Sequence, residues 1–221
     1  MRFLKQILLA FTLLGACALG ATGAQAEPKN GAQYQTLPNQ QNTDSGKKIE
    51  VIEFFAYYCP HCHVLEPVLK AWVKKHADNI VFKRVHISRD PSVAPQQRLF
   101  FTLEALGLTE QYHDKVFHAM HVERNRLNTD GMVFDFIAKQ GIDRKQFIDA
   151  YNSFGVGAKV RRAGEMMGTY KVDSWPMIAI DGRFITSPSL ANQNAKDEAE
   201  LHAQTLAVMD YLVAKAKAEK K

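Results

Sequence analysis

Two cysteines separated by two residues give this chain its most distinctive chemistry, in the segment Cys59-Pro60-His61-Cys62. Such a pair of thiols can close into a disulfide and reopen, which is redox chemistry. The sequence has one further cysteine, Cys17, near its start, so the pair is not part of a scaffold stapled by several disulfides. The spacing therefore predicts that the two thiols serve a reaction.

The flanking residues place this motif where a strand passes into a helix. Residues 51–58 are apolar and aromatic, as in a buried strand, and residues 63–73 have the pattern of a helix. The first turn of a helix offers unpaired N–H groups and the positive end of the helix dipole. Both stabilise a negatively charged sulfur, so we expect the pKa of the Cys59 thiol to be lowered.

The other three motif residues have separate predicted roles. Pro60 suits the first helical turn because its φ is already helical and its missing N–H is not needed there. His61 can carry positive charge and donate hydrogen bonds towards the Cys59 sulfur. Cys62 lies one turn further in and is expected to be the less exposed, resolving thiol. A stabilised thiolate favours the reduced form, so the motif predicts a donor of disulfides more than a reductant.

Three other interpretations of the motif remain open. A structural disulfide would gain little from closing so short a loop. A zinc site would need ligands beyond His61 and His63, and the sequence has no second C-x-x-C. The segment from Cys59 to His63 also matches the C-x-x-C-H pattern of haem attachment, although it follows an apolar aromatic strand rather than lying in a small helical domain.

The first 26 residues have the pattern of a secretory signal peptide. A basic start is followed by an apolar run over residues 7–21 and by an A-x-A cleavage site at residues 24–26, so the mature chain would begin at Glu27. An uncleaved membrane anchor is the alternative, but the run is short for a membrane span. Of 221 residues in total, the remainder is enough for one domain with an insertion.

A lipid anchor is a second interpretation of the leader. Residues 14–17 resemble a bacterial lipobox, which would make Cys17 a lipid-bearing N-terminus. The apolar run continues past Cys17 to the A-x-A site, which favours a soluble exported product. The 28 Lys and Arg residues only slightly outnumber the 23 Asp and Glu residues, and no basic stripe with interleaved aromatics occurs, so we expect no nucleic acid partner.

The chain divides into three parts after the leader. Residues 27–90 contain strand, helix and strand in the β-α-β order, residues 91–170 are helical, and residues 171–221 return to a hairpin and a final helix. The expected strands are residues 34–37, 48–56, 79–87, 177–180 and 183–186, and the expected helices are residues 60–76, 96–106, 110–121, 130–140, 144–152, 157–170 and 196–218. Asp181-Gly182 signals the tight turn of the hairpin, and residues 215–221 are expected to form a solvated tail.

This order of elements resembles the thioredoxin fold, an α/β fold, with an inserted all-helical domain. Residues 54–62 look like those of the DsbA family of bacterial periplasmic thiol:disulfide oxidoreductases, and Cys-Pro-His-Cys is the tetrapeptide typical of that family. The resemblance covers about residues 34–215. It implies a periplasmic enzyme in which Cys59 forms the mixed disulfide with a substrate and Cys62 resolves it.

The resemblance also implies a cis-proline opposite the cysteines, just before the hairpin. The matching residue is Pro176, which would present the backbone of the preceding residue to an extended substrate chain. That preceding residue is Trp175, which departs from the smaller residues expected there. Because it borders the sulfurs, the redox poise and substrate preference of this chain do not follow from the family.

A buried acid beneath the disulfide is the other implied site residue. The match is Glu53, in an otherwise apolar strand, where a carboxylate is costly unless it is paired or protonated. In the family this acid assists proton movement to and from the inner thiol, here Cys62. Arg84 or Lys83 on the next strand is the nearest match to its basic partner. A Glu53 side chain that points to water is the simpler alternative.

The implied partners are newly exported, unfolded proteins with free cysteines and a DsbB-like quinone-linked membrane oxidase. Substrates would dock on apolar surface near the disulfide, to which Tyr57, Tyr58, Trp175 and Phe184 can contribute, although aromatics near strand ends are more often core. We expect no cofactor and a monomer. His113, His118 and His121 suggest a metal site, but ordinary surface or packing histidines are favoured because no carboxylate or cysteine partner is evident.

Three competing functions remain at this point. A reductase or isomerase would use the same thiols in the reverse direction, and Trp175 keeps that interpretation open. A c-type haem electron carrier would use the two cysteines and His63. A binding module or chaperone would need neither thiol.

Overall fold

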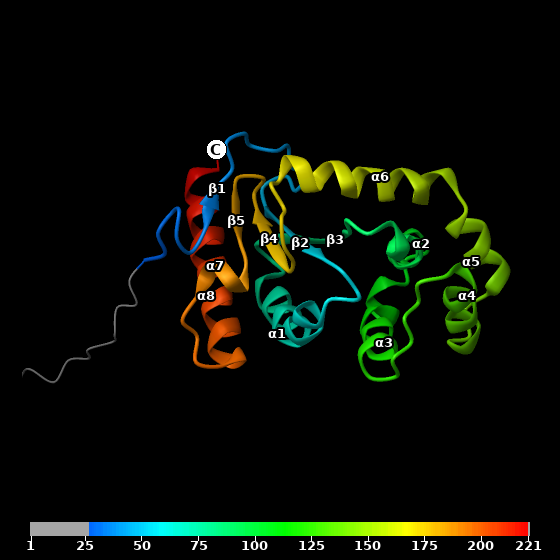
Figure 1. Cartoon of the computed structure of the whole chain (residues 1–221). Helices are drawn as coiled ribbons and strands as arrows, with labels where there is room; N and C mark the ends of the chain where they lie inside the picture. Colours follow the sequence, from blue (N-terminus) through cyan, green and yellow to red (C-terminus); the bar gives the residue numbers. More distant parts are fainter. Residues whose placement is uncertain (1–26, 221) are drawn as a thin grey trace, which may run out of the picture.

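The computed structural model describes residues 27–220 (Figure 1). The predicted signal peptide with its cleavage site, and the alternative lipid site at Cys17, lie outside these residues. Within the described part, no helix combines the length and the apolar character needed to cross a bilayer.

A five-stranded mixed sheet forms the centre of the fold, in the order β1-β5-β4-β2-β3. Strand β2 is parallel to β3 and antiparallel to β4, and every residue of β2 is buried. That burial follows from a nearly continuous apolar sequence, as is usual for a strand covered on both faces. The strands are β1 (Gln35–Thr36), β2 (Ile49–Phe55), β3 (Ile80–His86), β4 (Met177–Ile180) and β5 (Phe184–Thr186).

Five helices are inserted between β3 and β4, where the sequence predicts them, and each agrees with its expected range to within three residues. Side chains cap the N-termini of α4, α5 and α6. The capping residues are Thr129, Asp143 and Ser153, respectively, and each accepts a hydrogen bond from a backbone N–H in the first turn of its helix. That the insertion is a separate domain stays a prediction. The helices are α1 (Pro60–His76), α2 (Ala94–Ala105), α3 (Thr109–His121), α4 (Asp130–Lys139), α5 (Arg144–Tyr151), α6 (Phe154–Thr169), α7 (Pro188–Ala191) and α8 (Glu198–Glu219), with a 3-10 turn at Pro91–Val93.

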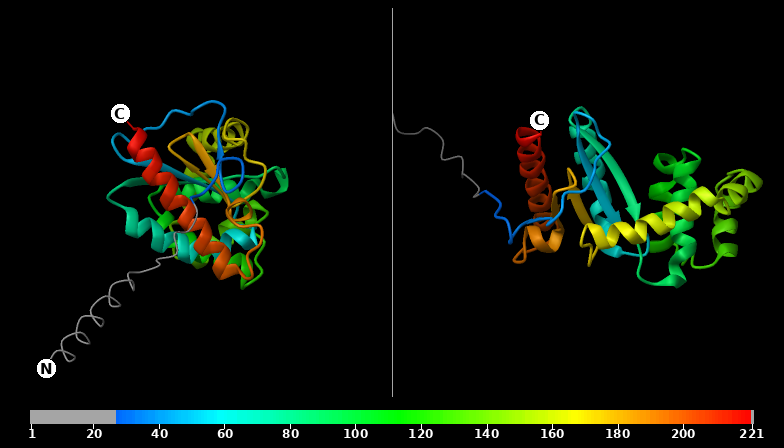
Figure 2. Two further views of the ribbon diagram at one scale, coloured as in Figure 1. Left: turned by 90° about the vertical axis from the view of Figure 1, so that its left-hand side faces the viewer. Right: turned by 90° about the horizontal axis from the view of Figure 1, so that it is seen from above.

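Two apolar clusters lie on opposite sides of the sheet. On one side, Leu65 of α1 and Leu212 of α8 pack against Val51 of β2. On the other side, Phe54 belongs to a larger cluster that continues into the inserted helices through residues such as Phe100. Figure 2 shows the long helix α6 running from the far end of the insertion back to the sheet. The site is thus built where the sheet, α1 and the insertion meet.

The hairpin between β4 and β5 turns at Asp181-Gly182, as the sequence predicts. Both residues have positive φ, 52° and 63°, as a type I′ turn requires. Gly182 has a second reason to be glycine, because a Cβ atom there would lie 2.2 Å from the carbonyl oxygen of Gln41. The turn is therefore packed against the loop that precedes β2.

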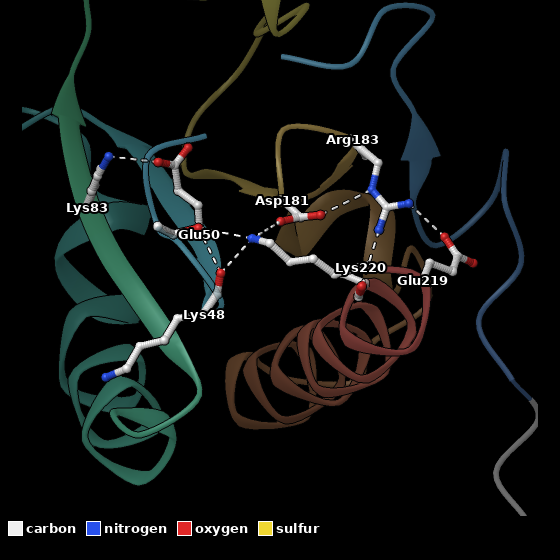
Figure 3. Close-up of polar contacts among 9 residues, drawn as sticks. Lys48, Glu50, Lys83, Asp181, Arg183, Glu219 and Lys220 are labelled. Atoms are coloured by element: carbon white, nitrogen blue, oxygen red, sulfur yellow. Dashed lines mark hydrogen bonds and ion pairs between the residues drawn. The ribbon is translucent and has the colours of Figure 1, made fainter. Parts of the chain in front are cut away.

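The prediction of a solvated tail is wrong in part: residues 217–219 are exposed, but Ala216 is buried and Lys220 is held against the sheet. Helix α8 continues to Glu219, and the amine of Lys220 donates hydrogen bonds to Asp181 Oδ1 at 3.0 Å and to the carbonyl oxygen of Lys48 at 2.7 Å (Figure 3). Arg183 lies between Asp181 and Glu219 and pairs with both, at 3.3 and 2.7 Å. The long side chains reach back to the hairpin, so the C-terminal turn of α8 is held to the sheet.

Candidate active site

Cys59 caps the N-terminus of α1. Its backbone is extended, Pro60 occupies the first helical position, and the Cys59 sulfur accepts a hydrogen bond from the N–H of Cys62 at 3.4 Å. Both thiols are free, and both are buried, Cys62 completely and Cys59 with 6% of its surface exposed. The local sequence thus aims the unpaired N–H groups of the helix start at one sulfur.

The two thiols have opposite acidities. A hydrogen bond from the Cys62 thiol, together with the backbone N–H groups of Cys62 and His61, outweighs burial and lowers the pKa of Cys59 to about 6. Burial, followed by the hydrogen bond to Cys59, raises the pKa of Cys62 well above its ordinary value. The exposed ring of His61 contributes less through its charge than its backbone N–H does. Cys59 is therefore the thiolate and Cys62 the protonated partner.

The loop before β4 covers this sulfur. The Trp175–Pro176 peptide bond is cis, and the carbonyl oxygen of Trp175 lies 3.6 Å from the Cys59 sulfur, which can donate a hydrogen bond to it only when protonated. The Trp175 ring packs edge-on against Tyr58, with ring centroids 6.1 Å apart, and both residues are part exposed. Tyr57 and Phe184, the other two aromatics considered for the docking surface, are buried in the core, which is the position that the sequence favours for aromatics near strand ends.

Glu53 points into the protein. It is fully buried on β2, its Oε2 accepts a hydrogen bond from Arg84 Nε at 3.2 Å, and its Oε1 has no partner. Burial, followed by repulsion from Glu66, raises the pKa of Glu53 to about 8 against the opposing effect of Arg84. Lys83, the other candidate partner, instead pairs with Glu50 at 2.7 Å. Glu53 is therefore a protonated acid at neutral pH.

Sequence reasoning missed two further members of this buried cluster. Glu66 of α1 accepts a hydrogen bond from Arg84 Nη2 at 2.5 Å, and its other oxygen lies 3.4 Å from Nε2 of His113 on α3. The position of Glu66 could have been predicted from its spacing, because a residue four positions after Cys62 lies on the same face of the helix. His113 contacts the site through the fold, and its sequence neighbours do not indicate this.

His118 and His121, which were considered for metal binding, make contacts of another kind. Among residues 27–220, no group of three or more His, Cys, Asp and Glu side chains is arranged to hold a metal ion. His121 Nε2 donates a hydrogen bond to the carbonyl oxygen of Tyr57 at 2.7 Å, and its ring stacks on His63 with centroids 4.6 Å apart. His118 lies on the surface beside Glu123. The His63 ring thus packs between α1 and α3.

Comparison with known proteins agrees with this geometry. Residues 50–198 match the model of the DSBA-like thioredoxin domain. The chain is 38% identical over 191 residues to the thiol:disulfide interchange protein DsbA of Burkholderia cepacia, covering 86% of this chain and 90% of that one. It is 37% identical over 216 residues to the DsbA of Bordetella parapertussis, covering 98% and 96%.

The same relationship holds for solved structures. The crystal structure of Pseudomonas aeruginosa DsbA superimposes with a TM-score of 0.79 at 29% identity, covering 87% of this chain and 96% of that one. The matches confirm the predicted thioredoxin-like fold and do not favour the haem-carrier or reductase interpretations. By its motif, its fold and these matches, the chain belongs to the DSBA-like thioredoxin-domain family and is a thiol:disulfide oxidoreductase.

Proposed function

We propose that the Cys59–Cys62 pair donates its disulfide to newly exported proteins in the periplasm. The observation that carries this proposal is the opposite acidity of two neighbouring thiols, Cys59 with a pKa of about 6 and Cys62 with a pKa raised by burial. A stabilised Cys59 thiolate favours the reduced enzyme, and an enzyme whose reduced form is favoured is an oxidant when it carries the disulfide.

The transfer takes two exchange steps. A substrate thiolate attacks the Cys59 sulfur of the disulfide, which forms a mixed disulfide and releases Cys62 as a thiolate. A second substrate thiolate then attacks the substrate sulfur of the mixed disulfide, which forms the substrate disulfide and releases the Cys59 thiolate. Two electrons pass from the substrate to the enzyme. The low pKa of Cys59 makes it the better leaving group in the second step.

Glu53 and the cis-proline loop have supporting roles in this scheme. Glu53 holds a proton at neutral pH and donates it towards the newly formed Cys62 thiolate. Pro176 fixes the loop so that the Trp175 backbone, close to the Cys59 sulfur, can pair with an extended substrate chain. The part-exposed rings of Tyr58 and Trp175 give that chain an apolar surface.

Reoxidation completes the cycle. We assign it to a DsbB-like quinone-linked membrane oxidase, because the return of the two thiols to a disulfide requires an acceptor of two electrons. The export signal predicted over residues 1–26 supports a periplasmic location, where such disulfides persist.

Titration of the reduced protein tests the proposal directly. Thiolate absorbance in the ultraviolet, followed against pH, is expected to rise with a midpoint near pH 6. The transition should disappear in Cys59→Ala and persist in Cys62→Ala with a higher midpoint, because that variant lacks the hydrogen bond from the Cys62 thiol. Cys59→Ala is expected to lose disulfide exchange. In Cys62→Ala the Cys59 thiolate can still attack a substrate disulfide and displace one substrate thiolate, and mixed disulfides should accumulate because no inner thiol is present to release them. A midpoint at the ordinary thiol value, or exchange that survives in Cys59→Ala, would contradict the proposal. Insulin-reduction and scrambled-substrate assays distinguish an oxidase from a reductase or isomerase.

A further inference from the structure

Two buried carboxyl groups share one guanidinium beneath the cysteines. Arg84 Nη2 lies 2.5 Å from Glu66 Oε1, and Arg84 Nε lies 3.2 Å from Glu53 Oε2. The side chains of all three are at most 9% exposed. Ionising both carboxyl groups in a buried site with a single cation is energetically unfavourable. The pair therefore retains a proton over part of the pH range. The question is which carboxyl group holds it.

His113 enters this cluster from α3 with a defined orientation. The Tyr57 hydroxyl lies 3.0 Å from His113 Nδ1, and Tyr57 keeps its proton because burial raises its pKa well above the ordinary value. A protonated hydroxyl can donate to Nδ1 or accept from it, so the other ring nitrogen decides the tautomer. Nε2 faces Glu66 Oε2 at 3.4 Å, where a carboxylate repels a bare ring nitrogen and attracts an N–H, so in the neutral ring the hydrogen sits on Nε2 and Nδ1 accepts from Tyr57. Burial lowers the pKa of His113, which keeps the ring neutral.

The surroundings of the His113 ring hold it in place. It packs edge-on against Phe55 and Phe117, with centroids 5.2 and 5.0 Å away, and only 3% of the residue is exposed. The order of groups from Tyr57 through His113 to Glu66 resembles a relay of hydroxyl, imidazole and carboxylate. In such a relay the carboxylate orients the ring, and the ring N–H stabilises the carboxylate charge.

Glu53 has weaker contacts than Glu66. Oε1 of Glu53 and Oε2 of Glu66 are both buried without a hydrogen-bond partner, but Glu66 Oε2 faces His113 Nε2 at 3.4 Å. The one contact of Glu53 with Arg84 is also longer than that of Glu66. We propose that His113, oriented by Tyr57, holds Glu66 as the carboxylate that neutralises Arg84 and so leaves Glu53 as the acid that carries the exchangeable proton. His113 is then a positioning residue, contributed by the inserted helices to the proton chemistry of Cys62.

The other titratable groups near the His113 ring make different contacts or remain neutral. On α3, Asp114 pairs with Lys70 at the surface, and Glu110 is mostly exposed, with Oε1 3.8 Å from Arg84 Nη1. On β3, the buried His86 has its pKa lowered by burial to about 3 and remains neutral. Glu53 and Glu66 are therefore the two groups that compete for the proton, and the His113 N–H acts on only one of them.

Carboxyl-carbon NMR of the oxidised protein, with 13C-labelled glutamate, tests this inference between pH 4 and pH 9. The oxidised form is chosen because neither cysteine then titrates. In the unaltered protein the Glu53 signal is expected to titrate well above the ordinary carboxyl range, and the Glu66 signal is followed beside it. His113→Phe removes the donor, so the Glu53 midpoint should fall by at least one pH unit, a tenfold change in proton affinity, and the Glu66 signal should move towards the protonated position.

Three further variants complete the design. His113→Gln retains an N–H donor, so the Glu53 midpoint should return most of the way to its value in the unaltered protein. His118→Gln, at an exposed position on the same helix, should leave the Glu53 and Glu66 signals unchanged. Tyr57→Phe keeps the ring but frees the His113 tautomer, so it should shift Glu53 in the same direction by a smaller amount. That variant keeps the test available if His113→Phe does not fold.

The inference rests on the proposed function, but different experimental results contradict each of them. Unchanged Glu53 and Glu66 titrations in both His113→Phe and Tyr57→Phe overturn the role of His113, even if Cys59 still exchanges disulfides. Exchange that survives in Cys59→Ala overturns the proposed function, whatever the two glutamate signals do.

Discussion

Replacement of Glu53 by Gln is expected to stabilise the protein at neutral pH. The folded state raises the pKa of this carboxyl group from its ordinary 4.5 to about 8. Between these values the folded chain retains a proton that the unfolded chain releases, so the folded state binds more protons and its stability falls as pH rises. At pH 7 the cost is about 3 kcal/mol, from 1.36 kcal/mol per pH unit over the interval above 4.5.

The Glu53→Gln variant removes that cost because its amide has no proton to retain. The free energy of unfolding, measured by urea titration at intervals from pH 4 to pH 10, should differ little between variant and parent at pH 4. The difference should then grow with pH in favour of the variant, reach about 3 kcal/mol near pH 7 and stop growing above pH 8. Both proteins are compared in the oxidised form, so that the Cys59 thiolate makes no contribution.

Glu104→Gln is the matched control, since Glu104 is a half-exposed glutamate paired with Lys159 on the surface. It should show no comparable pH-dependent difference. A Glu53→Gln stability difference that is constant with pH, or that shrinks as pH rises, refutes the argument that Glu53 is buried as a neutral acid.

Three other substitutions test the packing that supports the site, each by the midpoint of urea unfolding. Gly182→Ala should destabilise by more than about 1 kcal/mol, because its φ is positive and the new Cβ meets the Gln41 carbonyl; a neutral effect would contradict the turn geometry. Lys220→Met should cost about 1 kcal/mol or more through loss of the charged hydrogen bond to Asp181, and an unchanged midpoint would show that the C-terminal turn is not held. Leu65→Ala should cost about 3 kcal/mol, since the side chain is fully buried between α1 and the sheet; a cost below 1 kcal/mol would place it outside the core.

The sequence predicts the parts of this structure that depend on local pattern. The strand before Cys59, the helix after it and the Asp181-Gly182 turn follow from apolar periodicity, a proline at the first helical position and a turn dipeptide that tolerates positive φ. The short helix α7 and the 3-10 turn after β3 were not predicted, because elements of three or four residues carry too little periodicity.

The contacts between charged groups could not be predicted in the same way. A sequence indicates that Glu53 is unusual in an apolar strand, but it does not indicate that Glu66 and His113 approach the same arginine from two other elements. Lys220 illustrates the same limit, because a run of charged residues at a chain end has the composition of a solvated tail. In each case a tertiary contact decides whether the charge is solvated or buried.

The pairing of β2 with β4 sets the order in which the chain can fold. Val51 pairs with Ile180, and Glu53 with Ile178, so the central ladder joins positions separated by the whole helical insertion. Such pairings have a high contact order and slow the search for the native topology. During synthesis, Cys59 and its helix emerge long before the loop that carries Trp175. A chain that stops after α6 has both thiols but no covering loop, so we expect the complete site to form only after synthesis has passed β4.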